Sequence, residues 1–178
     1  MSASLSLVSE LERIANAVES DGGDARVPLP AVAERIAKSL NVKTGEVAIL
    51  GLSQRWRHLH FLFPEALKNV GHIPLSSPTA LAARTARESR PEINNAFVDT
   101  RHASVFEGVK VAGEAGEAIQ KIISAPILFD ARVVGVIQIS RKGASPVSAG
   151  PDFSSDELGK VLAVCKPLGK LLQRIVAE

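Results

Sequence analysis

Residues 121–141 read KIISAPILFDARVVGVIQISR, two apolar runs with a short polar break between them. The runs 121–129 and 133–141 flank the turn Asp130-Ala-Arg132, a pattern that predicts an antiparallel β-hairpin. Pro126 has no N–H to donate, so we expect it at a bulge or an unpaired position. Both strands are apolar at successive positions, which predicts a central hairpin covered on both faces. The expected core residues of the hairpin include Ile127, Val136, Ile137 and Ile139.

Amphipathic helices are predicted toward both ends of the chain. Apolar residues recur at three- and four-residue spacing over 5–19, and again over about 30–41. The last helix begins with a capping box formed by Ser154 and Glu157, and it carries a broad apolar stripe. Pro167 lies inside this helix, so we expect a kink there.

Shorter elements fill the middle of the chain. Strands are predicted over 46–52, 56–63 and 93–98, with a helix over 79–89 before the third of them. The glycine-rich stretch 108–117 indicates a loop. Helices and strands do not alternate strictly along the chain, which favours an α+β fold over a parallel α/β fold.

Length and composition narrow the function classes. A chain of 178 residues fits one domain with helical extensions. The longest uncharged apolar run, near 122–129, is too short to span a bilayer, and no signal peptide is evident. A single cysteine, Cys165, excludes an internal disulfide framework, so we expect a cytoplasmic protein with no membrane partner. The net charge of +2 and the scarcity of aromatic residues argue against nucleic acid as a partner.

From Gly71-His-Ile-Pro-Leu onward, the sequence resembles the GAF domain family. The similar segments are Ala80–Asp99, the hairpin from Ser124, and Phe153-Ser-Ser-Asp-Glu-Leu at the start of the last helix. The resemblance implies a PAS-related α+β fold, with an antiparallel sheet and helices on both faces. It implies a ligand pocket on one face, roofed by loops and the helix over 79–89, with the terminal helices on the other face. We expect residues 1–27 to form an N-terminal helix and linker, and 28–178 to form the domain.

The sequence departs from three branches of that family. Cys165 lies on the stripe of the last helix, which does not suit covalent attachment of a bilin. One cysteine cannot form the internal disulfide of the branch that reduces free methionine sulfoxide. In the pattern of the cyclic-nucleotide branch, Phe153-Ser-Ser-Asp-Glu has one spacer too few and Asn95 is followed by Ala96. We therefore expect no enzyme activity and no cofactor.

A polar cluster follows the predicted ligand-side helix and is the candidate ligand site. Arg101 and His102 would meet an anionic ligand, with Asp99 orienting Arg101. The alternative is a hydrogen-bonded surface loop. The full set of candidate residues is Arg84, Asn95, Asp99, Arg101, His102 and Phe106.

The remaining groups of histidine and arginine residues are better explained without a metal or ligand site. His58 and His60 have a spacing that metals accept, but no cysteine or carboxylate lies near them in sequence, so we expect no metal. The series Arg84, Arg87 and Arg90 is interrupted by acidic residues and favours a solvated helix face. We find none of the catalytic triad, zinc-protease, phosphate-loop or dinucleotide-binding motifs.

The terminal helices carry more apolar surface than one sheet face can bury, which predicts a homodimer. The candidate interface residues are Leu11, Ile14, Leu168, Leu172 and Ile175. The expected function is a sensory or regulatory module that binds an unknown small molecule and signals through its dimer or a protein partner. The alternative is a dimerisation or interaction module of the same fold without a ligand.

Overall fold

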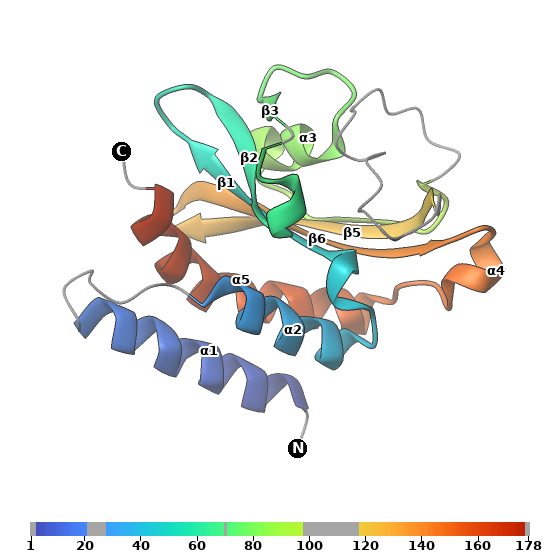
Figure 1. The fold of residues 1–178 in the computed structure, drawn as a ribbon, viewed down its shortest axis with the longest axis horizontal. Coiled ribbons are helices and arrows are strands. Elements are labelled where there is room, and N and C mark those ends of the chain that lie inside the picture. Colours follow the sequence, from blue (N-terminus) through green and yellow to red (C-terminus); the bar gives the residue numbers. More distant parts are fainter. Residues whose placement is uncertain (1–2, 21–27, 70, 98–117, 177–178) are drawn as a thin grey trace.

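The computed structural model describes residues 3–20, 28–69, 71–97 and 118–176 (Figure 1). Six antiparallel strands form one sheet in the order β3-β2-β1-β6-β5-β4. The strands are β1 (Val47–Ser53), β2 (His58–Phe63), β3 (His72–Pro74), β4 (Glu92–Asn94), β5 (Ala118–Phe129) and β6 (Arg132–Gly143). The helices are α1 (Ala3–Ser20), α2 (Leu29–Leu40), α3 (Leu81–Glu88), α4 (Pro146–Ala149) and α5 (Ser155–Val176), with short 3₁₀ turns η1 (Thr44–Glu46) and η2 (Glu65–Leu67). This is the α+β arrangement that the sequence predicts.

The hairpin of β5 and β6 is confirmed as the framework of the sheet. β6 lies between β1 and β5, and only the short strand β4 lies beyond β5. The four predicted core residues are fully buried: Ile127, Val136, Ile137 and Ile139. The turn between the strands is one residue shorter than expected, because Phe129 already pairs with Arg132. Its two residues, Asp130 and Ala131, both have positive φ angles (52° and 65°), as the tight turns that suit strand twist require.

Pro126 corrects the expectation of an unpaired or bulged position. It is in register with Val136, and the irregularity of the ladder follows one residue later, between Ile127 and Leu128. On the other side of β5, the register of β4 extends only to Ser124. The proline therefore lies beyond the end of the neighbouring edge strand, a position where the missing N–H costs little.

Two helical layers cover one face of the sheet. α5 and α2 contact the strands directly, while α1 packs against α5 and α2 from outside (Figure 1). The side chains of this layer form one apolar core with the sheet, including Leu11 of α1, Ile36 of α2 and Leu168 of α5. The terminal helices thus lie on the same side of the sheet, as predicted, and α3 covers the opposite face. The division of the chain at residue 27 stays a prediction.

The last helix begins with the predicted capping box. Ser154 Oγ accepts a hydrogen bond from Glu157 N at 3.2 Å, and Glu157 Oε1 accepts one from Ser154 N at 3.0 Å. The helix continues through Pro167 to Val176. Leu168 and Leu172, beyond the proline, are fully buried within one chain. These two predicted interface residues therefore belong to the core of their own chain.

Gly169 marks a close approach between α5 and β5. A Cβ atom at this position would lie 2.0 Å from the carbonyl oxygen of Leu128. Gly159 in the same helix has nothing within 4 Å of such an atom. Because both glycines lie in α5, replacing each one by alanine separates the effect of tertiary packing from the effect of helix propensity.

We expect Gly169→Ala to destabilise the protein and Gly159→Ala to stabilise it. Alanine in an open helical position gains about 1 kcal/mol over glycine. At Gly169 the added methyl group displaces the strand backbone, at a cost of about 1–3 kcal/mol or more. Urea unfolding of both variants measures the difference. Equal stabilisation of both variants would show that α5 does not lie this close to Leu128.

Candidate functional site

Buried polar side chains gather on the face of the sheet that α3 covers. Ser124 of β5 lies directly opposite Gln138 of β6, and Ser140 is the next residue on this face of β6. Together with Thr85 of α3 and Gln120 at the start of β5, they are all less than 7% exposed. We call these five residues the polar patch.

Hydrogen bonds connect the centre of the polar patch to α3. Thr85 Oγ1 and Ser124 Oγ are 2.7 Å apart, and Gln138 Nε2 donates to Ser124 Oγ at 3.2 Å. Thr85 also donates to the carbonyl of Leu81 one turn earlier at 2.9 Å. Ser140 Oγ donates to the carbonyl of Glu46 at 3.3 Å. Because these hydrogen bonds reach Thr85, a ligand that contacts Ser124 or Gln138 would change the position of α3.

Gln120 lies at the end of the polar patch, where the β5–β6 ladder is irregular. The register shifts between Ile119 and Lys121, so Gln120 is the extra residue of a bulge. Its Nε2 donates to the carbonyl of Gly143 at 2.9 Å, whereas its Oε1 is buried and has no hydrogen-bond partner among the residues that the structure describes. A buried acceptor without a donor costs about 1–3 kcal/mol. Such an acceptor is suited to a donor that a ligand brings.

The sequence reasoning missed the polar patch. It took 121–129 and 133–141 as continuous apolar strands, although Ser124, Gln138 and Ser140 are polar within them. Because successive residues of a strand point to opposite faces, these positions signal that one face differs from the other. The face that α2 and α5 cover carries Ile137 and Ile139, which belong to an apolar core cluster.

The candidate residues from the sequence are only partly described by the structure. Asp99, Arg101, His102 and Phe106 lie outside the described residues and stay predictions. Arg84 forms an ion pair with Glu92 at 2.6 Å on the surface of α3 and β4.

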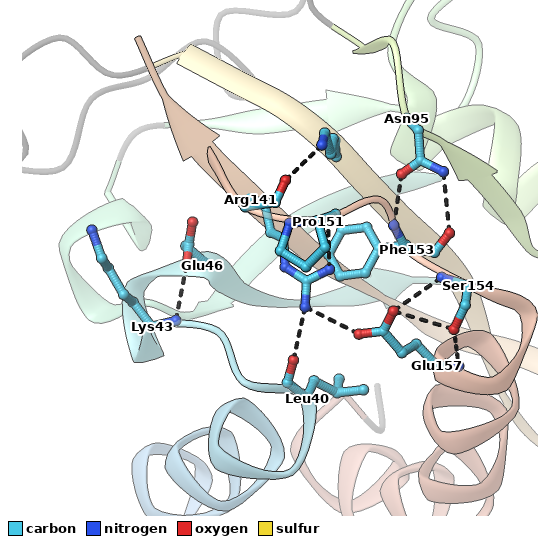
Figure 2. Close-up of polar contacts among 11 residues, drawn as sticks. Leu40, Lys43, Glu46, Asn95, Arg141, Pro151, Phe153, Ser154 and Glu157 are labelled. Atoms are coloured by element: carbon cyan, nitrogen blue, oxygen red, sulfur yellow. Dashed lines mark hydrogen bonds and ion pairs between the residues drawn. The ribbon is translucent and has the colours of Figure 1, made fainter. Parts of the chain in front are cut away.

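Asn95 forms a clamp between two distant segments (Figure 2). Its Nδ2 donates to the carbonyl of Phe153 at 3.1 Å, and its Oδ1 accepts from Phe153 N at 2.8 Å. This clamp fixes the chain after β4 to the loop before α5. The role of Asn95 that the structure shows is therefore architectural, and its predicted role toward a ligand stays untested.

Arg141 is the centre of a second buried polar cluster, which is structural (Figure 2). Its guanidinium is stacked over the ring of Phe153, with 4.2 Å from Cζ to the ring centroid. It donates to Glu157 Oε2 at 3.0 Å and to the carbonyls of Leu40 and Pro151 at 3.1 and 2.9 Å. One side chain of β6 thereby fixes the end of α2 and the beginning of α5.

A surface groove of about 580 Å³ lies at the same end of the hairpin as Arg141. It is lined by Lys121, Pro146, Val147, Gly150, Pro151 and Asp152. Lys121 Nζ donates to the carbonyl of Gly150 at 2.6 Å and pairs with Asp152 at 2.9 Å. The cation of this groove is thus engaged with the groove's own backbone and carboxylate.

Cys165 is buried in the core beneath the sheet. Burial raises the pKa of its thiol from 9.0 to about 12. The thiol is therefore protonated at neutral pH, whereas thiol nucleophiles react as thiolates.

In the part of the chain that the structure describes, no helix is long and apolar enough to cross a membrane.

Comparison with solved structures identifies the fold. The GAF domain of a phosphoenolpyruvate-protein phosphotransferase from Acinetobacter matches with a TM-score of 0.65 and 14% identity, over 99% of this chain and 97% of that one. The chain has a GAF-domain fold. The GAF domain of A. aeolicus NLH2, in an inactive state, also matches, with a TM-score of 0.57 and 12% identity over 96% of each chain. No protein-family model and no curated protein matches the sequence.

A third match overturns the prediction that the chain is not an enzyme. Free methionine-R-sulfoxide reductase from Neisseria meningitidis, in complex with its substrate, has the same GAF fold. It matches with a TM-score of 0.57 and 14% identity, over 94% of this chain and 90% of that one. The prediction was wrong because the GAF fold carries catalysis as well as regulation.

Proposed function

We propose that this chain is a cytoplasmic regulatory module of the GAF fold that binds a small polar molecule on the α3 face of the sheet. The polar patch carries the proposal. It places hydroxyl and amide groups within an otherwise apolar core, on the face opposite the terminal helices. Ligand sites typically combine an apolar wall with a few convergent polar groups.

The energetics of the polar patch support this assignment. An apolar residue at Gln120 or Gln138 would avoid the cost of removing an amide from water, about 1–3 kcal/mol from mutational data. Gln120 Oε1 lacks a partner to offset that cost. A hydrogen-bond donor on the ligand would supply the missing interaction. The untested residues Arg101 and His102 would meet an anionic group of the same ligand.

The signal would leave the site through α3. Thr85 connects α3 to Ser124 at the polar patch. In the same half of the helix, Arg87 donates to the carbonyls of Leu75 and Ser77, in the segment that leads from β3. A shift of α3 would thus move the edge of the sheet as well. We further propose that two copies, or one copy and a signalling partner, respond to this movement.

Native mass spectrometry of the protein purified from its own host tests the proposal. We expect the wild type to retain a small molecule and Gln138→Leu to lose it, because leucine has a similar volume but no amide. Gln173→Leu is the matched control, since Gln173 lies on α5, on the other side of the sheet. Circular dichroism verifies that each variant folds.

Two results would contradict this function. One is a ligand that Gln138→Leu retains as fully as the wild type does. The other is a wild-type protein that captures nothing even after equilibration with a metabolite extract of the host. The second result would favour the alternative, a GAF-fold interaction module without a ligand.

A further inference from the structure

Three of the four histidines of the chain meet at one edge of the sheet. His58 and His60 lie two residues apart on β2, so their side chains share a face. His72 of β3 is directly opposite His60 in the antiparallel register. Directly opposed residues of antiparallel strands also share a face. The fold thus brings His72 next to two histidines that precede it by twelve and fourteen residues in the sequence.

Ring geometry confirms that the three imidazoles are neighbours. The ring centroids of His58 and His72 are 4.0 Å apart, with 16° between the ring planes. The rings of His58 and His60 are 6.1 Å apart and nearly perpendicular, at 84°. His58 and His60 are half-buried, and His72 is exposed. A solute can therefore reach the cluster from its His72 side.

We propose that His58, His60 and His72 bind a divalent transition metal ion of the zinc type at this edge. Neutral imidazole is a preferred ligand of zinc, copper and nickel. A pair at i and i+2 on one strand, with a third histidine on the adjacent strand, presents three nitrogens from one rigid surface. The sequence argument against a metal rested on the lack of a third ligand, and the strand register supplies one.

Side-chain rotation completes the site. Within the described ranges, no group of three His, Cys, Asp or Glu side chains could hold a metal ion in the conformations that the structure shows. In stacked rings the nitrogen lone pairs lie in parallel planes and do not converge. The terminal torsion of histidine is broad, so a ring can rotate and re-aim a nitrogen in exchange for the other interactions that His58 and His60 make. Zinc–nitrogen distances of about 2.0–2.1 Å are then within reach of rings whose centroids are 4.0 Å apart.

The location connects this site to the rest of the molecule. β3 is a three-residue edge strand, and the chain from its end leads to α3. A metal that crosslinks β2 to β3 would hold this short strand in register. Because the ion binds the folded state, it would also raise the melting temperature, and the rise would grow with the logarithm of its free concentration above the dissociation constant.

Isothermal titration of untagged protein with Zn²⁺ alone tests the proposal, with the melting temperature as a second readout. At about pH 7.5 we expect one Zn²⁺ to bind per chain. His58→Gln, His60→Gln and His72→Gln should each weaken binding by at least about tenfold, as even the loss of a supporting residue does at metal sites. The matched control is His102→Gln, which removes the remaining histidine and should bind as the wild type does.

The result that overturns the proposal is the absence of saturable Zn²⁺ binding by the wild type. Binding that all three variants retain, or that His102→Gln loses to the same extent, would overturn it as well. Circular dichroism shows whether each variant folds. His72→Gln keeps the test decisive if a half-buried histidine proves necessary for folding, because His72 is exposed.

Discussion

Leu172→Glu is expected to unfold the protein. Leu172 is fully buried, and its Cδ2 atom lies 2.6 Å from the position that a Cβ on Gly135 of β6 would occupy. A carboxylate placed in this apolar cluster loses its hydration, which costs several kcal/mol. Domains of this size are stable by only about 5–15 kcal/mol. Circular dichroism and urea titration measure the loss.

Leu162→Glu is the matched control for this prediction. It makes the same chemical change in the same helix, but Leu162 is 41% exposed. Surface substitutions of this kind usually alter the free energy of unfolding by less than about 0.5 kcal/mol. A folded, monomeric Leu172→Glu protein would contradict the burial of Leu172 and restore the interface that the sequence suggested.

The burial of leucines on the terminal helices also changes which surface a homodimer would use. Leu11, Leu168 and Leu172 are buried within one chain, and Ile14 is half-buried. Of the predicted interface residues, Ile175 remains exposed, at 39%. Leu162 is the other large apolar side chain exposed on the described part of α5. Sedimentation of the wild type and of Leu162→Glu would test a dimer that uses this outer surface.

Arg141→Met is expected to cost about 3–5 kcal/mol, the range for breaking a buried ion pair by removing one partner. Arg141 is 4% exposed, and it donates to Glu157 and to two backbone carbonyls. Methionine can fill much of the space over the Phe153 ring but donates nothing. The carbonyls of Leu40 and Pro151 would lose this donor inside the protein. Urea unfolding monitored by circular dichroism gives the difference in free energy.

Arg84→Met provides the control for Arg141. The Arg84–Glu92 pair is shorter than the Arg141–Glu157 pair, at 2.6 Å against 3.0 Å, but its two side chains are 44% and 35% exposed. Exposed ion pairs contribute at most about 1 kcal/mol, so this variant should remain close to the wild type. If both variants were destabilised equally, burial would not be what distinguishes the two arginines.

Local patterns in the sequence were sufficient to predict most of the helices and strands. The spacing of apolar residues predicted the terminal helices, and the pair Ser154 and Glu157 predicted where α5 begins. The apolar runs on either side of Asp130 predicted the central hairpin. Boundaries were less accurate: the helix expected from residue 79 begins at Leu81, and the hairpin turn is one residue shorter. Such errors arise because a cap or a turn depends on backbone angles that several residues can adopt.

The candidate site depended on relations that a linear pattern does not contain. Each residue of the polar patch looks like an ordinary polar position in the sequence, since the partners Thr85 and Ser124 are 39 residues apart. His72 likewise joins His58 and His60 only through the register of two strands. Which residues oppose one another across a sheet is set by strand order and register.

The sequence by itself determined the kinds of elements and the faces on which they are apolar, because periodicity and capping are properties of neighbouring residues. Tertiary structure decided which of those faces meet. Leu172 is in the core and Leu162 is not, although both are leucines of the same helix. Arg141 is a buried support whereas Arg84 is a surface ion pair. The physical reason is that burial and desolvation depend on what packs against a side chain, and that neighbour comes from a distant part of the chain.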